Sequence, residues 1–333
     1  MKTVLITSQA FGTQLDINHR AELISYFAEH GWHIIWNPRQ QAMSATDIIK
    51  INEEHLLDAI VVYSSSDEIN RKVFEQCRQL KVVSRHGVGI ENIDIQAAKK
   101  AGVQIKTTAA MPGYETVADL TFALMLSVAR KVHIIDAQLR TNNWFRPVSS
   151  DIWGKTLGVL GVGRIGKAVI KRAQGFGMKV IAHTSHPDMA YFFANGITLC
   201  SKEELIAGAD FITLHCTLTE QTKGLLDVPE FALMKPTAFV INTARAGLVN
   251  QGALLAALKN KTIAGAAVDV FDIEPVIDDP LLKANLDNLV ATAHVGSYTF
   301  DSIKQMDFLA AKNVVEMVRD RDDLDYASQL KIS

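Results

Sequence analysis

Three residues in the second half of the sequence, Arg245, Glu274 and His294, each follow a short apolar run typical of a buried parallel strand. Their types suit hydride transfer to a carbonyl group. A histidine can donate the proton that the oxygen needs, a carboxylate can keep it protonated near neutral pH, and an arginine can bind an anionic substrate. Because loops beyond the carboxyl ends of parallel strands converge on the ligand, we expect these catalytic residues to lie together.

A glycine motif earlier in the chain indicates a dinucleotide. Gly161, Gly163 and Gly166 form a GxGxxG turn that follows a strand-like run and precedes a helix expected from about Lys167. In this context Gly161 permits the tight turn, Gly163 lets the backbone approach a pyrophosphate, and Gly166 lets the helix pack against the strand. The phosphates are expected at the N-terminus of that helix.

The end of the next strand bears on the choice of cofactor. Enzymes that use NAD normally carry an acidic residue here, whereas this sequence has His183, Thr184, Ser185 and His186. Hydroxyls and imidazoles without a carboxylate favour NADP, or use of both forms of NAD(P). The stretch contains no arginine, and a threonine can also contact a ribose hydroxyl, so NAD stays open.

The order of apolar runs along the chain indicates an α/β protein of two domains, because short β-branched runs alternate with longer amphipathic stretches. Strands are expected at residues 4–7, 33–36, 59–63, 81–84, from 156, 179–183, 211–215, 238–242 and 289–293. Helices are expected at 20–30, 114–140 and 299–320, followed by a polar tail. The helix at 114–140 is apolar on nearly every face, which suits burial between domains or subunits, or an ordinary core helix.

Composition limits the class of partner. The 333 residues carry a formal net charge of −2, so no general attraction to nucleic acid or to an anionic membrane is expected. Three cysteines without a CxxC pair predict neither a disulfide framework nor a metal site, and they suit the cytoplasm. No apolar run is long enough to span a membrane. The expected partner is a small molecule.

Several motifs occur in the order found in one known family. They are the glycine turn, His215 to Thr219 with Thr222, Asn242 to Arg245, Asp269 to Phe271 with Glu274 and Pro275, and His294 to Ser297. On these residues the chain resembles the D-isomer-specific 2-hydroxyacid dehydrogenase family over nearly its whole length. The resemblance implies two Rossmann-like doubly wound parallel-sheet domains, with the active site in the cleft between them.

The resemblance also implies a domain division and a homodimer. Residues 1–105 with 298–333 would form the substrate-binding domain, and residues 106–297 the NAD(P)-binding domain. The long helix after Pro112 would be the interdomain and dimerisation element.

The resemblance assigns roles to individual residues. Arg245 would bind the substrate carboxylate and carbonyl, His294 would be the acid/base and Glu274 would orient and charge it, while the backbone amides of Val88 and Gly89 would hold the substrate carboxylate. The residues expected at the cofactor are Gly161, Gly163, Arg164, Ile165, Gly166, His183, Thr184, Ser185, Cys216, Thr217, Thr222, Thr243, Asp269 and Gly296.

The implied reaction is hydride transfer between NAD(P)H and C2 of a small 2-keto or D-2-hydroxy acid, such as glyoxylate or hydroxypyruvate. The loop from Arg85 most resembles 3-phosphoglycerate dehydrogenases, where basic residues bind a phosphate, yet residues 64–68 offer hydroxyls and acids instead of arginine. Two further alternatives are a regulator that senses dinucleotides without turnover and a relative that oxidises phosphite. Two mild departures from the family pattern are Asp119, where a glutamate is usual, and Ala246, where a glycine is usual.

Overall fold

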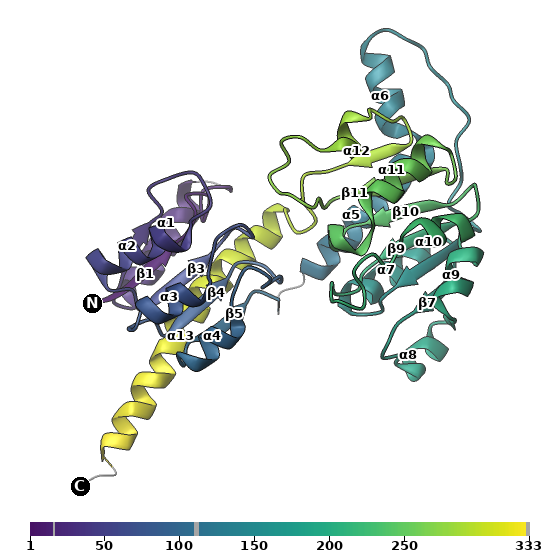
Figure 1. Ribbon diagram of the computed structural model, residues 1–333. Coiled ribbons are helices and arrows are strands. Elements are labelled where there is room, and N and C mark those ends of the chain that lie inside the picture. Colours follow the sequence, from purple (N-terminus) through teal and green to yellow (C-terminus); the bar gives the residue numbers. More distant parts are fainter. Residues whose placement is uncertain (16, 110–112, 331–333) are drawn as a thin grey trace. The chain divides into compact units, whose positions relative to one another are not determined.

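The computed structural model describes residues 1–15, 17–109 and 113–330. The chain divides into two compact units: unit 1 comprises Met1–Pro112 with Thr299–Ser333, and unit 2 comprises Gly113–Tyr298. Each unit is built on a parallel sheet with helices on both faces (Figure 1). Both units are Rossmann-like α/β domains, as the alternation of apolar runs predicts.

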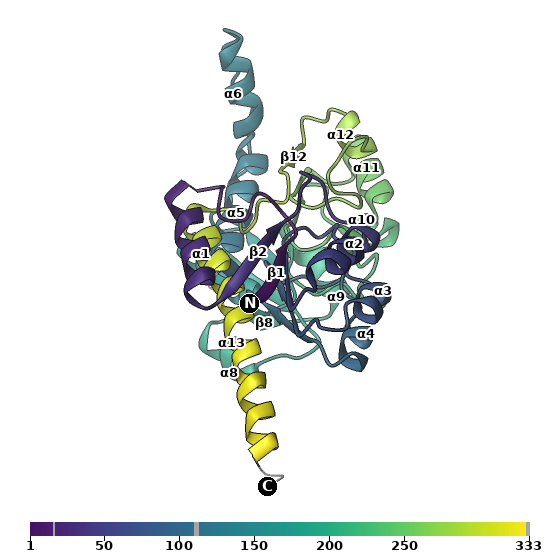
Figure 2. The same ribbon diagram turned by 90° about the vertical axis from the view of Figure 1, so that its left-hand side faces the viewer.

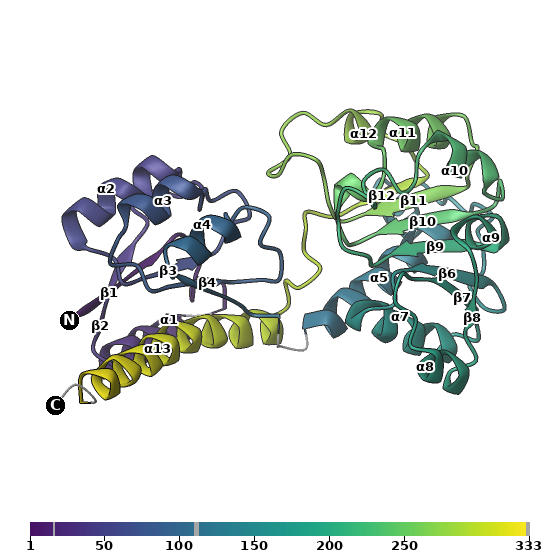
Figure 3. The same cartoon turned by 60° about the horizontal axis from the view of Figure 1, so that its bottom comes forward.

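Unit 1 contains a five-stranded sheet in the order β2-β1-β3-β4-β5. Its strands are β1 (Lys2–Ile6), β2 (Trp32–Trp36), β3 (Ala59–Val62), β4 (Val82–Arg85) and β5 (Gln104–Thr107). Its helices are α1 (Ile17–Glu29), α2 (Ala45–His55), α3 (Arg71–Gln76), α4 (Ile95–Lys100) and α13 (Phe300–Leu330). Figure 3 shows α1 and α13 on one face of this sheet and α2, α3 and α4 on the other.

The central strands of unit 1 are apolar because both of their faces are covered. All four residues of β3 are buried. On one face Phe27 of α1 and Val314 of α13 share a core with the sheet, and on the other face Ile48 of α2 and Val73 of α3 do so. The C-terminal helix is therefore part of the core of unit 1.

Unit 2 contains a seven-stranded sheet in the order β12-β11-β10-β9-β6-β7-β8. Its strands are β6 (Thr156–Leu160), β7 (Lys179–His183), β8 (Thr198–Leu199), β9 (Phe211–Leu214), β10 (Phe239–Asn242), β11 (Gly265–Val268) and β12 (Leu289–Ala291). Its helices are α5 (Gly113–Arg130), α6 (Val132–Arg140), α7 (Arg164–Gly175), α8 (Met189–Ala194), α9 (Lys202–Gly208), α10 (Val228–Leu233), η1 (Ala246–Leu248), α11 (Gln251–Lys259) and α12 (Pro280–Lys283).

The strand order of unit 2 reverses beside β6. From β6 the chain first adds β7 and β8 on one side, then crosses over to add β9 and the later strands on the other side. Helices α5, α7 and α8 cover one face of the sheet, and α9, α10, α11 and α12 cover the other (Figure 3). In doubly wound sheets, ligands bind at the carboxyl ends of the strands beside such a switch point, here between β6 and β9.

The single helix expected at residues 114–140 was wrong, because the structure has two helices there. Lys131 takes a left-handed conformation with φ 57° and interrupts the helix between α5 and α6. Seven side chains of α5 are buried and pack in the core of unit 2, whereas α6 has none. In Figure 2, α6 stands clear of the sheet of unit 2.

The polar tail expected after residue 320 was also wrong, because α13 continues to Leu330. Residues 321–330 contain neither glycine nor proline, so nothing in the local sequence stops the helix. The other expected strands and helices are present, with ends displaced by a few residues. No helix in the described residues is long and apolar enough to cross a membrane.

Candidate active site

The three expected catalytic residues follow neighbouring strands. Arg245 comes after β10, Glu274 after β11 and His294 after β12, and these strands are adjacent in the sheet of unit 2. Because the strands are parallel, their carboxyl ends lie along one edge of the sheet, and the loops that follow them meet there.

His294 and Glu274 form a direct ion pair. Nδ1 of His294 lies 2.6 Å from Oε2 of Glu274, and since an ionised carboxylate can only accept, this nitrogen carries the proton. The hydrogen bond that His294 donates to Glu274 raises the pKa of His294 above its usual value, against the opposing effect of burial. The pair therefore favours the protonated imidazole and leaves Nε2 for a reacting group.

Glu274 is held as an anion. Burial acts to raise the pKa of its carboxyl group, but the hydrogen bonds from His294 and from the amide of Phe271, with the nearby charge of Arg245, outweigh that effect and lower the pKa. The amide of Phe271 donates to Oε1 at 3.0 Å. One carboxylate oxygen thus anchors the loop after β11 while the other orients His294.

Asp269 braces the loop that carries His294. Its buried carboxylate accepts hydrogen bonds from the hydroxyl of Thr292 at 2.6 Å and from the amides of Val295 and Gly296 at 2.8 and 2.9 Å. These bonds flank His294, whose φ of 53° is rare for a residue other than glycine. We infer that the network around Asp269 offsets the strain of that backbone.

Asn242 organises the turn that carries Arg245. Its buried side chain accepts from the amide of Ala244 at 3.0 Å and donates to the carbonyl of Arg245 at 2.9 Å. The guanidinium of Arg245 bonds to the carbonyl oxygen of Ala244 at 2.7 Å and is partly exposed. Arginine at this position presents a permanent cation to a carboxylate substrate.

The glycine turn between β6 and α7 has the shape that a dinucleotide requires. Gly161 has φ 95°, and a Cβ there would lie 2.6 Å from the amide nitrogen of Cys216. A Cβ on Gly166 would collide with the carbonyl oxygen of Gly161. Gly163 is the N-cap residue of α7, and it has no side chain to bond the first amides of the helix. These amides are therefore left for a ligand. These residues fit a pyrophosphate at the helix N-terminus.

Other expected cofactor residues follow β9 and β10, at the same edge of the sheet as the glycine turn. Burial raises the pKa of Cys216 to about 11, so its thiol is neutral. Thr222 donates to the carbonyl of Thr217 at 2.6 Å, which uses its hydroxyl within the loop after β9. Buried Thr243 contacts Thr121 of α5 through their hydroxyl oxygens, 3.0 Å apart. Because Thr121 donates its hydroxyl proton to the carbonyl of Val117, Thr243 must donate to Thr121. Toward any other group, the hydroxyl of Thr243 can then only accept a hydrogen bond.

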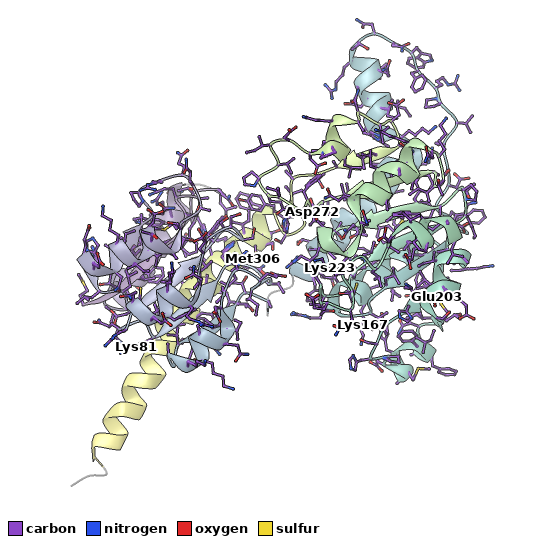
Figure 4. All side chains as sticks on the ribbon, in the orientation of Figure 1. Lys81, Lys167, Glu203, Lys223, Asp272 and Met306 are labelled. Atoms are coloured by element: carbon purple, nitrogen blue, oxygen red, sulfur yellow. The ribbon has the colours of Figure 1, made fainter. Side chains whose placement is uncertain are left out.

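The loop after β7 is polar, and a cation lies beside it. Nδ1 of His183 bonds to the carbonyl of Cys200 at 3.1 Å, while Ser185 bonds to His186 at 2.9 Å. Asp188, which begins α8, caps that helix and pairs with Lys167 at 3.1 Å. Lys167, labelled in Figure 4, lies four positions along α7 from the cap at Gly163.

The expected carboxylate-binding loop belongs to unit 1. Val88 is exposed, and Gly89 is partly buried. Arg85 itself is buried, and its guanidinium donates to the carbonyl oxygens of Val62, Tyr63, His86 and Gly89. Its Nε and Nη1 donate to backbone, so Arg85 helps to hold this loop.

Sequence reasoning missed Asn242, Thr121 and Lys167 as parts of the site. The sequence did indicate a role for Asn242, because an asparagine side chain at the end of a buried strand commonly forms a hydrogen bond with the backbone two residues later. Thr121 carried none, since its contact with Thr243 joins residues far apart in the chain. Among the described residues, no group of histidine, cysteine, aspartate or glutamate side chains is arranged to hold a metal ion.

The doubly wound sheet with its glycine turn, together with the paired histidine and glutamate, defines a nicotinamide-dependent oxidoreductase. Residues 122–296 match the family described as D-isomer specific 2-hydroxyacid dehydrogenase, NAD binding domain. The chain is 38% identical over 276 residues to a glyoxylate reductase of Thermococcus litoralis, covering 79% of this chain and 81% of that protein. It is 39% identical over 277 residues to a D-3-phosphoglycerate dehydrogenase of Methanocaldococcus jannaschii, covering 81% of this chain but 52% of that longer protein.

Among solved structures, the TT0316 protein from Thermus thermophilus superposes with a TM-score of 0.84 at 33% identity, covering 95% of this chain and 97% of that one. The chain belongs to the D-isomer specific 2-hydroxyacid dehydrogenase family. It is an NAD(P)-dependent dehydrogenase that transfers hydride between the nicotinamide cofactor and small 2-keto or 2-hydroxy acids.

Proposed function

We propose that this enzyme reduces a small, unphosphorylated 2-keto acid, such as glyoxylate or hydroxypyruvate, to the D-2-hydroxy acid. The observation that carries the proposal is the pairing of His294 with Glu274 at 2.6 Å, with Arg245 following the neighbouring strand. The bound nicotinamide supplies or accepts the hydride. Arg245 binds the carboxylate and polarises the keto group, and His294 donates its Nε2 proton to the developing alkoxide.

We further propose that the two units divide this work. Unit 2 binds the cofactor through the glycine turn and carries Arg245, Glu274 and His294. Unit 1 contributes the amides of Val88 and Gly89, which donate to the substrate carboxylate.

The choice of an unphosphorylated substrate rests on Arg85. Its guanidinium is buried, and Nε and Nη1 donate to backbone carbonyls, which favours a role in holding the loop over binding a phosphate. The neighbouring loop contains the exposed Glu68, whose negative charge disfavours a phosphorylated substrate. The phosphoglycerate dehydrogenase relative remains the specific alternative because of its 39% identity.

The proposal is tested by measuring oxidation of NADPH and of NADH with a panel of 2-keto acids. Glyoxylate, hydroxypyruvate, pyruvate, 2-ketogluconate and phosphohydroxypyruvate sample size and charge. We expect the highest kcat/KM with glyoxylate or hydroxypyruvate. A clear preference for phosphohydroxypyruvate would favour the phosphoglycerate alternative. Cofactor binding without turnover of any of them would favour a regulator that senses dinucleotides.

We also propose a preference for NADP. The loop after β7 offers the hydroxyls of Thr184 and Ser185 and the imidazole of His186, and its one carboxylate, Asp188, caps α8 and pairs with Lys167. The ammonium group of Lys167 forms an ion pair with Asp188 and so lies beside the loop. Lys167 supplies the cation that the loop itself lacks.

Thr184→Asp is expected to shift the preference toward NAD, because an aspartate at this position repels a 2′-phosphate and can bind ribose hydroxyls. The measurement is the ratio of kcat/KM for NADPH to that for NADH. Thr198→Asp, on the short edge strand β8, is the matched control for added charge and should leave the ratio unchanged. An unchanged ratio in Thr184→Asp would remove the role assigned to this loop.

Two properties of the whole protein belong to the same proposal. We propose a homodimer that buries the apolar side chains left exposed on α6 and in the segment after it, namely Val132, Leu139, Trp144, Phe145 and Val148. We propose a cytoplasmic location, since Cys77, Cys200 and Cys216 are all free thiols.

A further inference from the structure

A buried cluster of titratable side chains lies in the core of unit 1, apart from the residues assigned above. Asp307 of α13 faces His19 of α1 and His86, which follows β4. Oδ2 of Asp307 lies 3.0 Å from Nε2 of His19 and accepts from the amide of Gly12 at 3.2 Å. Oδ1 lies 2.9 Å from Nε2 of His86, without the alignment of a hydrogen bond.

The cluster is almost completely removed from solvent. The side chains of His19, His86 and Asp307 are 2%, 5% and 1% exposed. A buried carboxylate is costly unless polar groups surround it, so three partners around one carboxylate indicate that this position is structurally specified. The preceding residue of α13, Met306, is labelled in Figure 4.

His86 connects this cluster to the loop that we assign to the substrate carboxylate. Its ring stacks on Tyr63 with centroids 4.5 Å apart and meets the edge of Phe11, and its amide bonds to the carbonyl of Val62 at 2.9 Å. The next residue, Gly87, has φ 134°, and its amide donates to the hydroxyl of Thr108 at 2.9 Å.

The loop is therefore fixed from two sides. Arg85 donates to the carbonyls of His86 and Gly89 and so spans the turn from its first to its last residue. Asp307 meets the imidazole of His86 from α13. Gly87 and the exposed Val88 lie between these two anchors. The direction of the Val88 amide depends on where His86 is held.

We propose that Asp307 is a positioning residue for substrate binding, which acts through the imidazole of His86 to fix the amides of Val88 and Gly89 toward the substrate carboxylate. This inference rests on the proposed function, because it assumes that the loop binds a 2-keto acid. Interactions of this kind act on binding of the ground state and of the transition state alike, so they change KM more than kcat.

The test is steady-state kinetics with glyoxylate in Asp307→Ala and His86→Gln, together with the dissociation constant for the reduced cofactor by fluorescence. We expect each variant to raise KM about 10-fold, the effect of losing one charge-assisted contact, while kcat stays within about 3-fold and cofactor affinity is unchanged. Asp307→Asn keeps the size and polarity of the side chain and should recover part of the lost KM.

A double-mutant cycle tests whether Asp307 acts through His86. In the His86→Gln background, Asp307→Ala should raise KM little further. Val314→Ala is the matched control, since Val314 is equally buried on α13 but packs in the apolar core. It should lower thermal stability without changing KM.

Three results would overturn the inference. They are an unchanged KM in Asp307→Ala, fully additive effects in the double-mutant cycle, and the same KM increase in Val314→Ala. If Asp307→Ala does not fold, an unchanged KM in His86→Gln alone has the same meaning. A wild-type enzyme without turnover would instead overturn the proposed function, and this inference with it.

Discussion

His294 is held in an unusual way for a histidine. Its backbone is in the left-handed region at φ 53°, and hydrogen bonds that residues on both sides donate to Asp269 help to keep it there. Its ring is then fixed by Glu274, which also determines which nitrogen carries the bonded proton. The structure therefore fixes the position of the imidazole and favours its protonated form, which suits the proton donor that we propose for reduction.

The raised pKa of His294 predicts a pH dependence. Reduction needs the protonated imidazole, so kcat/KM should be highest at low pH and fall as pH rises through the raised pKa of His294. Glu274→Gln removes the hydrogen-bonded carboxylate, which is the largest cause of that shift, so the fall should move to lower pH and the maximal rate should drop. The measurement is the pH profile of 2-keto acid reduction.

Asp272→Asn is the control for Glu274→Gln, because it removes another carboxylate from the same loop. Among the described residues, no contact joins Asp272 to His294. Its profile should match that of the wild type. A profile for Glu274→Gln that also overlies the wild type would show that Glu274 does not set the protonation of His294.

At the scale of elements, the start of α7 determines how a dinucleotide can approach. Gly166→Ala places a methyl group against the carbonyl oxygen of Gly161, so either the turn or α7 must move. We expect the dissociation constant for the cofactor to rise about 10-fold or more, since the amides at the helix start lose their alignment. Isothermal titration calorimetry measures this change.

Gly175→Ala is the control, because Gly175 ends the same helix and a Cβ there meets nothing within 4 Å. It should bind the cofactor as the wild type does. Equal binding by Gly166→Ala would contradict the placement of the phosphates at the start of α7.

The order of elements could be predicted from sequence because parallel strands buried on both faces are continuous apolar runs, as in β3 and β9. The meeting of the three candidate catalytic residues at one edge of the sheet could be predicted because each lies in the loop after such a run. The break at Lys131 could not, since lysine has no intrinsic preference for φ 57°. The bonds from Asp269 to Val295 and Gly296 could not either, because they depend on how two separate loops pack.

At the scale of the whole molecule, apolar side chains of α6 and of the segment after it are exposed, and no other described part of the chain packs over them. Trp144 is 78% exposed and Val148 is 92% exposed. The homodimer proposed above would cover this surface. Such a surface in a lone protein would promote aggregation.

Trp144→Glu is therefore expected to weaken the dimer, because it places a charge in an apolar interface. Sedimentation velocity at several protein concentrations should show a shift from dimer to monomer. Phe193→Glu is the matched control, since Phe193 is 91% exposed on α8, and it should leave the dimer intact. A wild-type protein that sediments as a monomer at all concentrations would refute the homodimer.

The central claim is that His294 is the proton donor of a 2-keto acid reductase, and His294→Asn tests it most directly. Asparagine tolerates the left-handed backbone at this position, so the loop should keep its conformation while the acid is lost. We expect kcat for glyoxylate reduction to fall at least ~10²-fold, with the dissociation constant for the reduced cofactor unchanged. Turnover close to that of the wild type would contradict the account.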